Sequence, residues 1–169
     1  MTTWGWVLDR PMAGRQGDKA EGIRVVAQHK RARFDYTVEE TLEAGLELFG
    51  SEVKGLRHGT ANLTDSYAVP RGNELYLLNA RIGPYGSPGP FSPDPTRSRR
   101  LLLHRAEINR WSAKVRERGY SIIPLMLYFK RGRAKVQLGL CLGKTHEDRR
   151  ASIRERESRR EIERALRRG

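Results

Sequence analysis

The chain has 169 residues, with 33 Lys and Arg against 20 Asp and Glu and a formal net charge of +13. Its single cysteine, Cys141, excludes an intramolecular disulfide and a cysteine-based metal site. No apolar run reaches membrane-spanning length and no signal-peptide pattern opens the chain, so a cytosolic (cytoplasmic) protein is expected. The cationic excess favours an anionic partner, nucleic acid first, although a general arginine bias of the proteome would give the same totals.

Residues 1–26 mix tryptophan, proline and glycine and show no sustained hydrophobic period. They are predicted to form a poorly ordered extension. A basic run at residues 29–33 then leads to Phe34.

Residues 38–48 alternate between apolar and polar side chains, which predicts a long strand. Glu40 stands on the apolar parity, so a bulge is expected there, and Gly45 suggests a bend or a second bulge. Residues 50–57 predict a short helix with Ser51 as its N-cap. Two strands, 66–69 and 74–79, are expected around a turn.

Residues 83–95 contain five prolines and predict an irregular loop. A helix is expected over residues 101–118, followed by a strand from residue 120 that leads into a hairpin. The hairpin tip, residues 130–133, contains one glycine and three cations. A solvated polar turn is the simple alternative, but the tip is one of several basic clusters, which favours nucleic-acid binding.

Residues 144–169 contain ten cations, six acids and few aliphatic side chains. Two i,i+4 Glu–Arg pairs favour helix by about 0.2–0.5 kcal/mol each. Since no broad apolar face could pack this helix on the core, the tail is predicted to be disordered alone and helical on a partner.

These patterns predict a mostly β fold. We expect an oligonucleotide-binding-type antiparallel β-barrel in residues 27–143, with two or three flanking helices and a basic C-terminal tail. From the residues alone this supports an RNA- or DNA-binding module.

A basic-then-aromatic start and eight further strings then resemble one family, in unbroken order between residues 30 and 150. The strings are Glu39–Leu46, Glu52–Lys54, Leu56–Arg57, Ala61–Leu63, Asp65–Tyr67, Asp94–Arg97, Leu101–His104 and Leu127–Val136. Together they are similar to the SsrA-binding protein (small protein B, SmpB) family.

The resemblance implies an RNA-binding adaptor of trans-translation. Such a protein binds the tRNA-like domain of transfer-messenger RNA (tmRNA) and delivers it to stalled ribosomes. The tail would occupy the empty mRNA channel next to the decoding centre of the small subunit. The resemblance implies no catalysis, cofactor, metal or membrane, and a monomer is expected.

By the same resemblance, Glu43 faces the RNA, where a carboxylate can accept hydrogen bonds from base amino or imino groups. An ordinary outward strand residue is the alternative for that position. Leu102 corresponds to a neighbouring leucine, and the ring of Phe34 can stack on a base. The predicted phosphate contacts, which cannot all lie on one face, are Lys30, Arg31, Arg33, Lys54, Arg57, Arg99, Arg100, Lys130, Arg131, Arg133 and Lys135.

The tail residues predicted to contact the ribosome are Lys144, His146, Asp148, Arg149 and Arg150. Two positions depart from the family pattern. His29 replaces an asparagine that often precedes the Lys-Arg pair, and Glu147 occupies the usual place of a ring, with His146 one residue early.

An enzyme is disfavoured because the four histidines are scattered and no phosphate-cradling or metal-ligand motif occurs. A nuclease that uses Glu43 and Asp65 has no motif behind it. The better rival is a basic ribosomal or ribosome-assembly protein.

Overall fold

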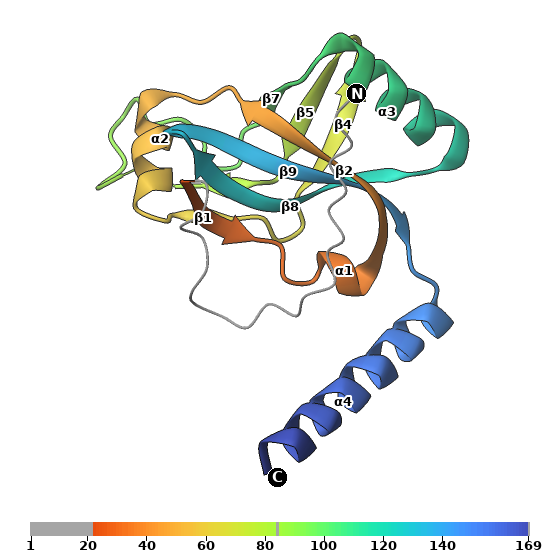
Figure 1. Cartoon of the computed structure of the whole chain (residues 1–169). Coiled ribbons are helices and arrows are strands. Elements are labelled where there is room, and N and C mark those ends of the chain that lie inside the picture. Colours follow the sequence, from red (N-terminus) through yellow and green to blue (C-terminus); the bar gives the residue numbers. More distant parts are fainter. Residues whose placement is uncertain (1–21, 84, 169) are drawn as a thin grey trace.

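The computed structural model describes residues 22–83 and 85–168 of the chain. Nine strands and four helices follow one another within these residues (Figure 1). The strands are β1 (Ile23–Gln28), β2 (Tyr36–Leu46), β3 (Ala61–Asn62), β4 (Tyr67–Arg71), β5 (Glu74–Leu78), β6 (Arg81–Ile82), β7 (Arg99–Leu102), β8 (Ser121–Lys130) and β9 (Arg133–Gly143). The helices are α1 (Ala32–Asp35), α2 (Gly50–Arg57), α3 (Arg105–Arg118) and α4 (His146–Arg168).

The main sheet closes on itself. Its strand order is β1-β8-β4-β5-β7-β2-β9, and β9 also pairs with β8, so all of its strands except β1 form a ring. Every pair in the sheet is antiparallel. Closure leaves few unpaired strand edges, which is how small barrels avoid edge-to-edge association. The predicted antiparallel barrel with flanking helices is confirmed.

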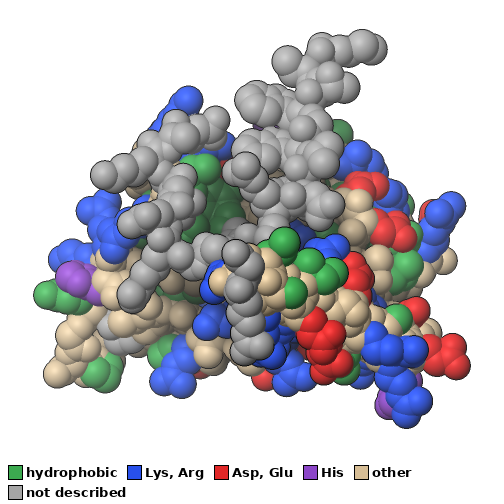
Figure 2. All heavy atoms as spheres, turned by 60° about the horizontal axis from the view of Figure 1, so that its bottom comes forward, with side chains coloured by type: hydrophobic (Ala, Val, Ile, Leu, Met, Phe, Trp, Pro, Cys, Tyr) green, Lys and Arg blue, Asp and Glu red, His purple; other side chains and the backbone are tan. Residues whose placement is uncertain are grey.

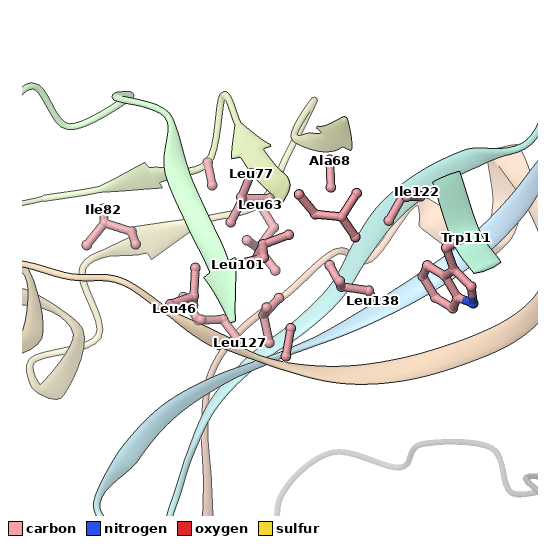
Figure 3. Close-up of a cluster of buried hydrophobic side chains, with 14 of the residues drawn as sticks. Leu46, Leu63, Ala68, Leu77, Ile82, Leu101, Trp111, Ile122, Leu127 and Leu138 are labelled. Carbon is pink, nitrogen blue, oxygen red and sulfur yellow. The ribbon is translucent and has the colours of Figure 1, made fainter. Parts of the chain in front are cut away.

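One hydrophobic cluster fills the interior of the ring (Figure 3). Alternate residues of the long strands point inward, among them Leu127 of β8 and Leu138 and Leu140 of β9, each 0% exposed. Trp111 of α3 joins the same cluster and is also fully buried. Each such side chain contributes about 1.5–3 kcal/mol on burial, so the alternation read from the sequence is what holds the barrel together.

A smaller cluster packs on the outer side of the sheet, beneath α1. It consists of Ala32, Ile123, Leu125 and Cys141. Cys141 alternates with the inward-facing Leu140, and burial raises the pKa of its thiol to about 12. The prediction of Cys141 as a small buried hydrophobe is confirmed.

The pairing of β2 with β9 shifts register between Val38 and Glu40. This bulge changes the phase of the strand, so that Val38 packs against the outer cluster while Leu42 packs against the core. The bulge predicted from Glu40 is confirmed, whereas no shift accompanies Gly45 in its described pairings. Gly45 lies instead where a Cβ would come 3.1 Å from the Cβ of Leu102.

The hairpin tip between β8 and β9 is a two-residue turn. Lys130 pairs with Arg133, and Arg131 and Gly132 both have positive φ, 51° and 75°. Positive φ at both central residues is typical of a type I′ turn, whose twist matches that of the strands. The predicted hairpin is confirmed.

Three local predictions are wrong, and one short helix was not predicted. Residues 23–26 belong to β1 rather than to an extension, and the other residues of that extension up to residue 21 lie outside the described part. The helix predicted from residue 101 begins at Arg105, because residues 99–102 pair with β5 and β2 as β7. Phe49, not Ser51, precedes α2, and its N–H donates to the Glu52 carboxylate at 2.9 Å. The helix that was not predicted is α1, which begins within the basic run and ends at Asp35, after Phe34.

Helix α4 projects away from the barrel and touches it next to α1 (Figure 1). Thr145 caps it, since Thr145 Oγ1 accepts from the Asp148 N–H at 3.3 Å. In return, the Thr145 N–H and hydroxyl donate to Asp148 Oδ2 at 3.1 and 2.6 Å. These bonds lower the pKa of Asp148. The helical conformation is the one expected for the tail on a partner, and disorder of the free tail stays a prediction.

Candidate nucleic-acid interface

Glu43 lies near the middle of the outer face of β2, opposite Gln137 of β9. Its Oε2 accepts a hydrogen bond from the Tyr128 hydroxyl at 2.5 Å and forms an ion pair with Lys130 Nζ at 3.2 Å. The Glu43 side chain remains 37% exposed. Partial burial opposes ionisation, but these two donors outweigh it and lower the pKa of Glu43. The site therefore presents a charged carboxylate at the surface.

Leu102 lies on the same side of the sheet as this carboxylate. It pairs with Gly45, two residues beyond Glu43 on the same side of β2, and the missing Cβ of Gly45 lets the Leu102 side chain pack closely. Leu101 points into the core, so Leu102 points outward and is 49% exposed. Arg100 shares that side of β7 and pairs with Glu47 at 2.7 Å. The structure thus places Glu43, Leu102 and Arg100 on the same side of the sheet, as a face that we call the Glu43 face.

The hairpin tip supplies cations beside this face. Lys130 belongs to both the Glu43 face and the hairpin tip. Lys135 of β9 lies opposite Gly45 of β2, and Arg131 and Arg133 are exposed at the turn. Phosphate contacts by such side chains hold a nucleic acid in register without reading its sequence.

Helix α2 joins the hairpin tip through the start of β1. Ile23 pairs with Lys130, and the next residue, Arg24, donates to the carbonyl of Arg57 at 2.5 Å. The exposed Lys54 and Arg57 therefore lie at the same end of the barrel as the tip.

Lys30, Arg31, Arg33 and Phe34 form a separate cluster, the α1 group, beyond the other end of β1. A strand of six residues spans about 17–20 Å, so this cluster is distant from the hairpin tip. In the view of Figure 2, Lys and Arg side chains lie at several separate places rather than in one continuous patch. The expectation that the predicted cations do not share one face is confirmed.

The α1 group contacts the tail. Lys144 Nζ donates to the carbonyl of Arg33 at 3.0 Å, and the Arg156 guanidinium lies 5.7 Å from the centre of the Phe34 ring. Arg31 pairs with Asp35 at 3.8 Å. His29, the departure from the family pattern, has Nδ1 3.2 Å from the carbonyl oxygen of Pro124, so its ring packs on β8.

The prediction that Arg99 contacts RNA is wrong. Its side chain is 0% exposed, and its guanidinium donates to Glu52 and to the carbonyls of Ala80, Pro95 and Arg97. A guanidinium whose donors are used inside the protein has none for a phosphate. The sequence placed it among four arginines between residues 97 and 105, where alternation of a short strand was the only sign of its burial.

Tyr128 was missed from the sequence. It alternates with Met126 and Lys130 on the outer side of β8, and that alternation could have placed it on the Glu43 face. In the tail, the exposed His146, Arg149 and Arg150 lie in the first turns of α4. Lys144 and Asp148 are already engaged by α1 and Thr145.

Histidine, cysteine and carboxylate side chains form no metal-binding cluster within residues 22–83 and 85–168. In the same residues, no helix combines the length and hydropathy needed to cross a membrane.

Comparisons with known proteins agree with one another. The family model described as SmpB protein matches residues 26–168. The chain is 67% identical over 147 residues to an SsrA-binding protein of Myxococcus xanthus (strain DK1622), covering 87% of this chain and 91% of the relative. It is 58% identical over 160 residues to an SsrA-binding protein of Anaeromyxobacter sp. (strain K), covering 94% and 98%.

Among solved structures, a similar chain comes from one described as "tmRNA-SmpB: a journey to the center of the bacterial ribosome". The two chains are 44% identical and superimpose with a TM-score of 0.61, over 75% of this chain and 93% of that chain.

Proposed function

Since the chain belongs to the SmpB protein family, we propose that it is an SsrA-binding protein that binds tmRNA and acts with it in trans-translation at the ribosome. It is an RNA-binding protein of that family and not an enzyme. The cationic excess fits this role, because each cation that neutralises a phosphate releases a counterion.

The observation that carries the proposal is the charged, partly exposed carboxylate of Glu43 beside the half-buried cations Lys130 and Lys135. Phosphate-seeking cations alone would bind any RNA. A carboxylate at the centre of a basic face repels phosphate and accepts from base N–H groups, which favours one RNA over others. We assign the Glu43 face and the hairpin tip to the tRNA-like domain of tmRNA.

The ribosome contact is assigned to the other end of the molecule. Helix α4 follows β9, contacts α1 and is exposed along most of its length. Its regularly spaced arginines suit the RNA-lined mRNA channel of a stalled ribosome, with His146, Arg149 and Arg150 nearest the decoding centre. The protein would act as a monomer in the cytoplasm, where translation takes place.

Sedimentation of ribosomes tests this function. Lysates that translate a message without a stop codon should carry the protein mainly on stalled ribosomes and in proportion to tmRNA. A control lysate that translates the same message with a stop codon should carry little. Stoichiometric protein on every ribosome in both lysates would contradict the adaptor function and favour a ribosomal protein.

A further inference from the structure

Tyr128 and Glu43 are joined by a hydrogen bond that crosses a strand. Tyr128 lies on β8 opposite Lys135, and Glu43 lies on β2 opposite Gln137, with β9 between them. The Tyr128 hydroxyl nevertheless donates to Glu43 Oε2 at 2.5 Å. The bond passes over β9 at the level of Val136.

The local packing makes this crossing possible. Val136 points into the core and is 0% exposed, so backbone alone lies on the outer surface between Lys135 and Gln137. Two strand spacings separate β8 from β2 by about 10 Å, a gap that a tyrosine and a glutamate can bridge together. Tyr128 is only 5% exposed, which fixes its ring and therefore the position of its hydroxyl.

The protonation states favour a one-way hydrogen bond. Burial, together with the bond to Glu43, raises the pKa of Tyr128, so the phenol keeps its proton and donates. The lowered pKa of Glu43 keeps its carboxylate charged and able only to accept.

Both donors reach the same oxygen of the carboxylate. Tyr128 and Lys130 bind Oε2, and these are the hydrogen bonds that the structure describes for the Glu43 side chain. We propose that Tyr128 is a positioning residue that holds the Glu43 carboxylate by Oε2, so that Oε1 accepts from the amino or imino N–H of an unpaired base in tmRNA. This inference rests on the proposed function.

The charges around Tyr128 and Glu43 favour a base rather than a phosphate as the group that Glu43 Oε1 recognises. A phosphate would be repelled by Glu43 and attracted by the neighbouring Lys130 and Lys135. A base edge with its N–H donors satisfies the carboxylate, while its own phosphates can reach these lysines. Fixing one oxygen before binding reduces the ordering needed at the interface.

The experiment compares the affinity of full-length variants for the tRNA-like domain of tmRNA at constant salt. Tyr128→Phe removes only the hydroxyl and should weaken binding about tenfold, since hydrogen bonds to charged groups are among the stronger ones. The salt dependence of binding should stay unchanged. Tyr120→Phe is a matched control, because its hydroxyl also donates to a glutamate, Glu39, at 2.5 Å. That control should bind as the wild type does.

A double-mutant cycle separates positioning from general structural damage. Tyr128→Phe combined with Glu43→Gln should bind no more weakly than Glu43→Gln alone. The pKa of Glu43, followed by NMR, should rise in Tyr128→Phe and stay unchanged in Tyr120→Phe.

Two outcomes would overturn the role of Tyr128 and leave the proposed function intact. In the first, Tyr128→Phe binds with wild-type affinity while Glu43→Gln binds weakly. In the second, the losses of the two single variants add up in the double variant. Wild-type affinity of Glu43→Gln would instead contradict the role of Glu43 in the proposed function.

Discussion

Arg99 Nη2 and Glu52 Oε1 lie 2.8 Å apart in an ion pair whose side chains are 0% and 1% exposed. Arg97 pairs with the other oxygen of the same carboxylate at 2.6 Å. The three residues attach α2 to β7, the strand that presents Leu102 and Arg100 at the Glu43 face. A cation that composition alone assigns to RNA binding is therefore part of the fold.

Glu52→Ala should lower the free energy of unfolding by about 3–5 kcal/mol, because it leaves the guanidinium of Arg99 buried without its partner. Urea unfolding monitored by circular dichroism measures the loss. Glu47→Ala is the matched control: it breaks the exposed pair with Arg100, and the expected loss is below about 1 kcal/mol. Equal losses in the two variants would contradict the structural role of the buried pair.

The stability conferred by Glu52 should depend on pH. Burial opposes ionisation of this carboxylate, but hydrogen bonds from two guanidinium groups and a backbone N–H outweigh it and lower its pKa below 4.5. Its contribution is then complete above the unfolded-state pKa and is lost as the pH falls through the folded-state value. The difference in unfolding free energy between wild type and Glu52→Gln should be constant from pH 7 to about 5 and shrink below that. A difference that grows on acidification would show that the carboxylate is not stabilised in its charged form.

Arg131→Asn should reduce the salt dependence of tmRNA binding. Asparagine tolerates the positive φ of 51° at this position, so the variant removes a charge and keeps the turn. If Arg131 neutralises one phosphate, the slope of log K against log salt should fall by about 0.7–0.9.

Arg71→Asn, in the β4–β5 hairpin and outside the predicted interface, serves as its control and should leave the slope unchanged. The assignment of the hairpin tip would be wrong if the two variants changed the slope equally.

Removal of residues 145–169 should separate RNA binding from ribosome rescue. The shortened chain keeps Lys144, whose N–H and Nζ donate to the carbonyls of Asp35 and Arg33, so α1 and the barrel should remain intact. Affinity for free tmRNA should change less than about twofold, because the tail lies outside the Glu43 face. Rescue of ribosomes on a message without a stop codon should be abolished in a purified translation system. Loss of both activities together would refute this division of roles.

The barrel could be predicted from the sequence because its long strands alternate regularly. Leu138 and Leu140 of β9 face the core with period 2. In β2, Glu40 revealed the bulge by interrupting the alternation of that strand. The short elements could not be predicted in this way. Two-residue strands such as β3 and β6 are too short to show a period, and β7 was hidden in an arginine-rich run that continued into a helix.

The candidate site was partly predictable for a related reason. Sequence patterns indicate which charged residues point outward from a strand. They do not show which side chains these residues contact, because those contacts depend on how the strands pair. Lys130 was expected at a phosphate and is found on Glu43, while Tyr128 reaches Glu43 only because β9 brings β8 and β2 within range. Arg99 carries the charge expected of an RNA contact, but its side chain is buried like that of a core residue.

The adaptor function requires this chain to recognise tmRNA specifically rather than RNA in general. Its most direct test is a competition gel shift with the labelled tRNA-like domain of tmRNA and an excess of ordinary tRNA at physiological salt. We expect the complex to survive the competitor. Equal displacement by any RNA would contradict it and reduce the protein to a general basic RNA binder.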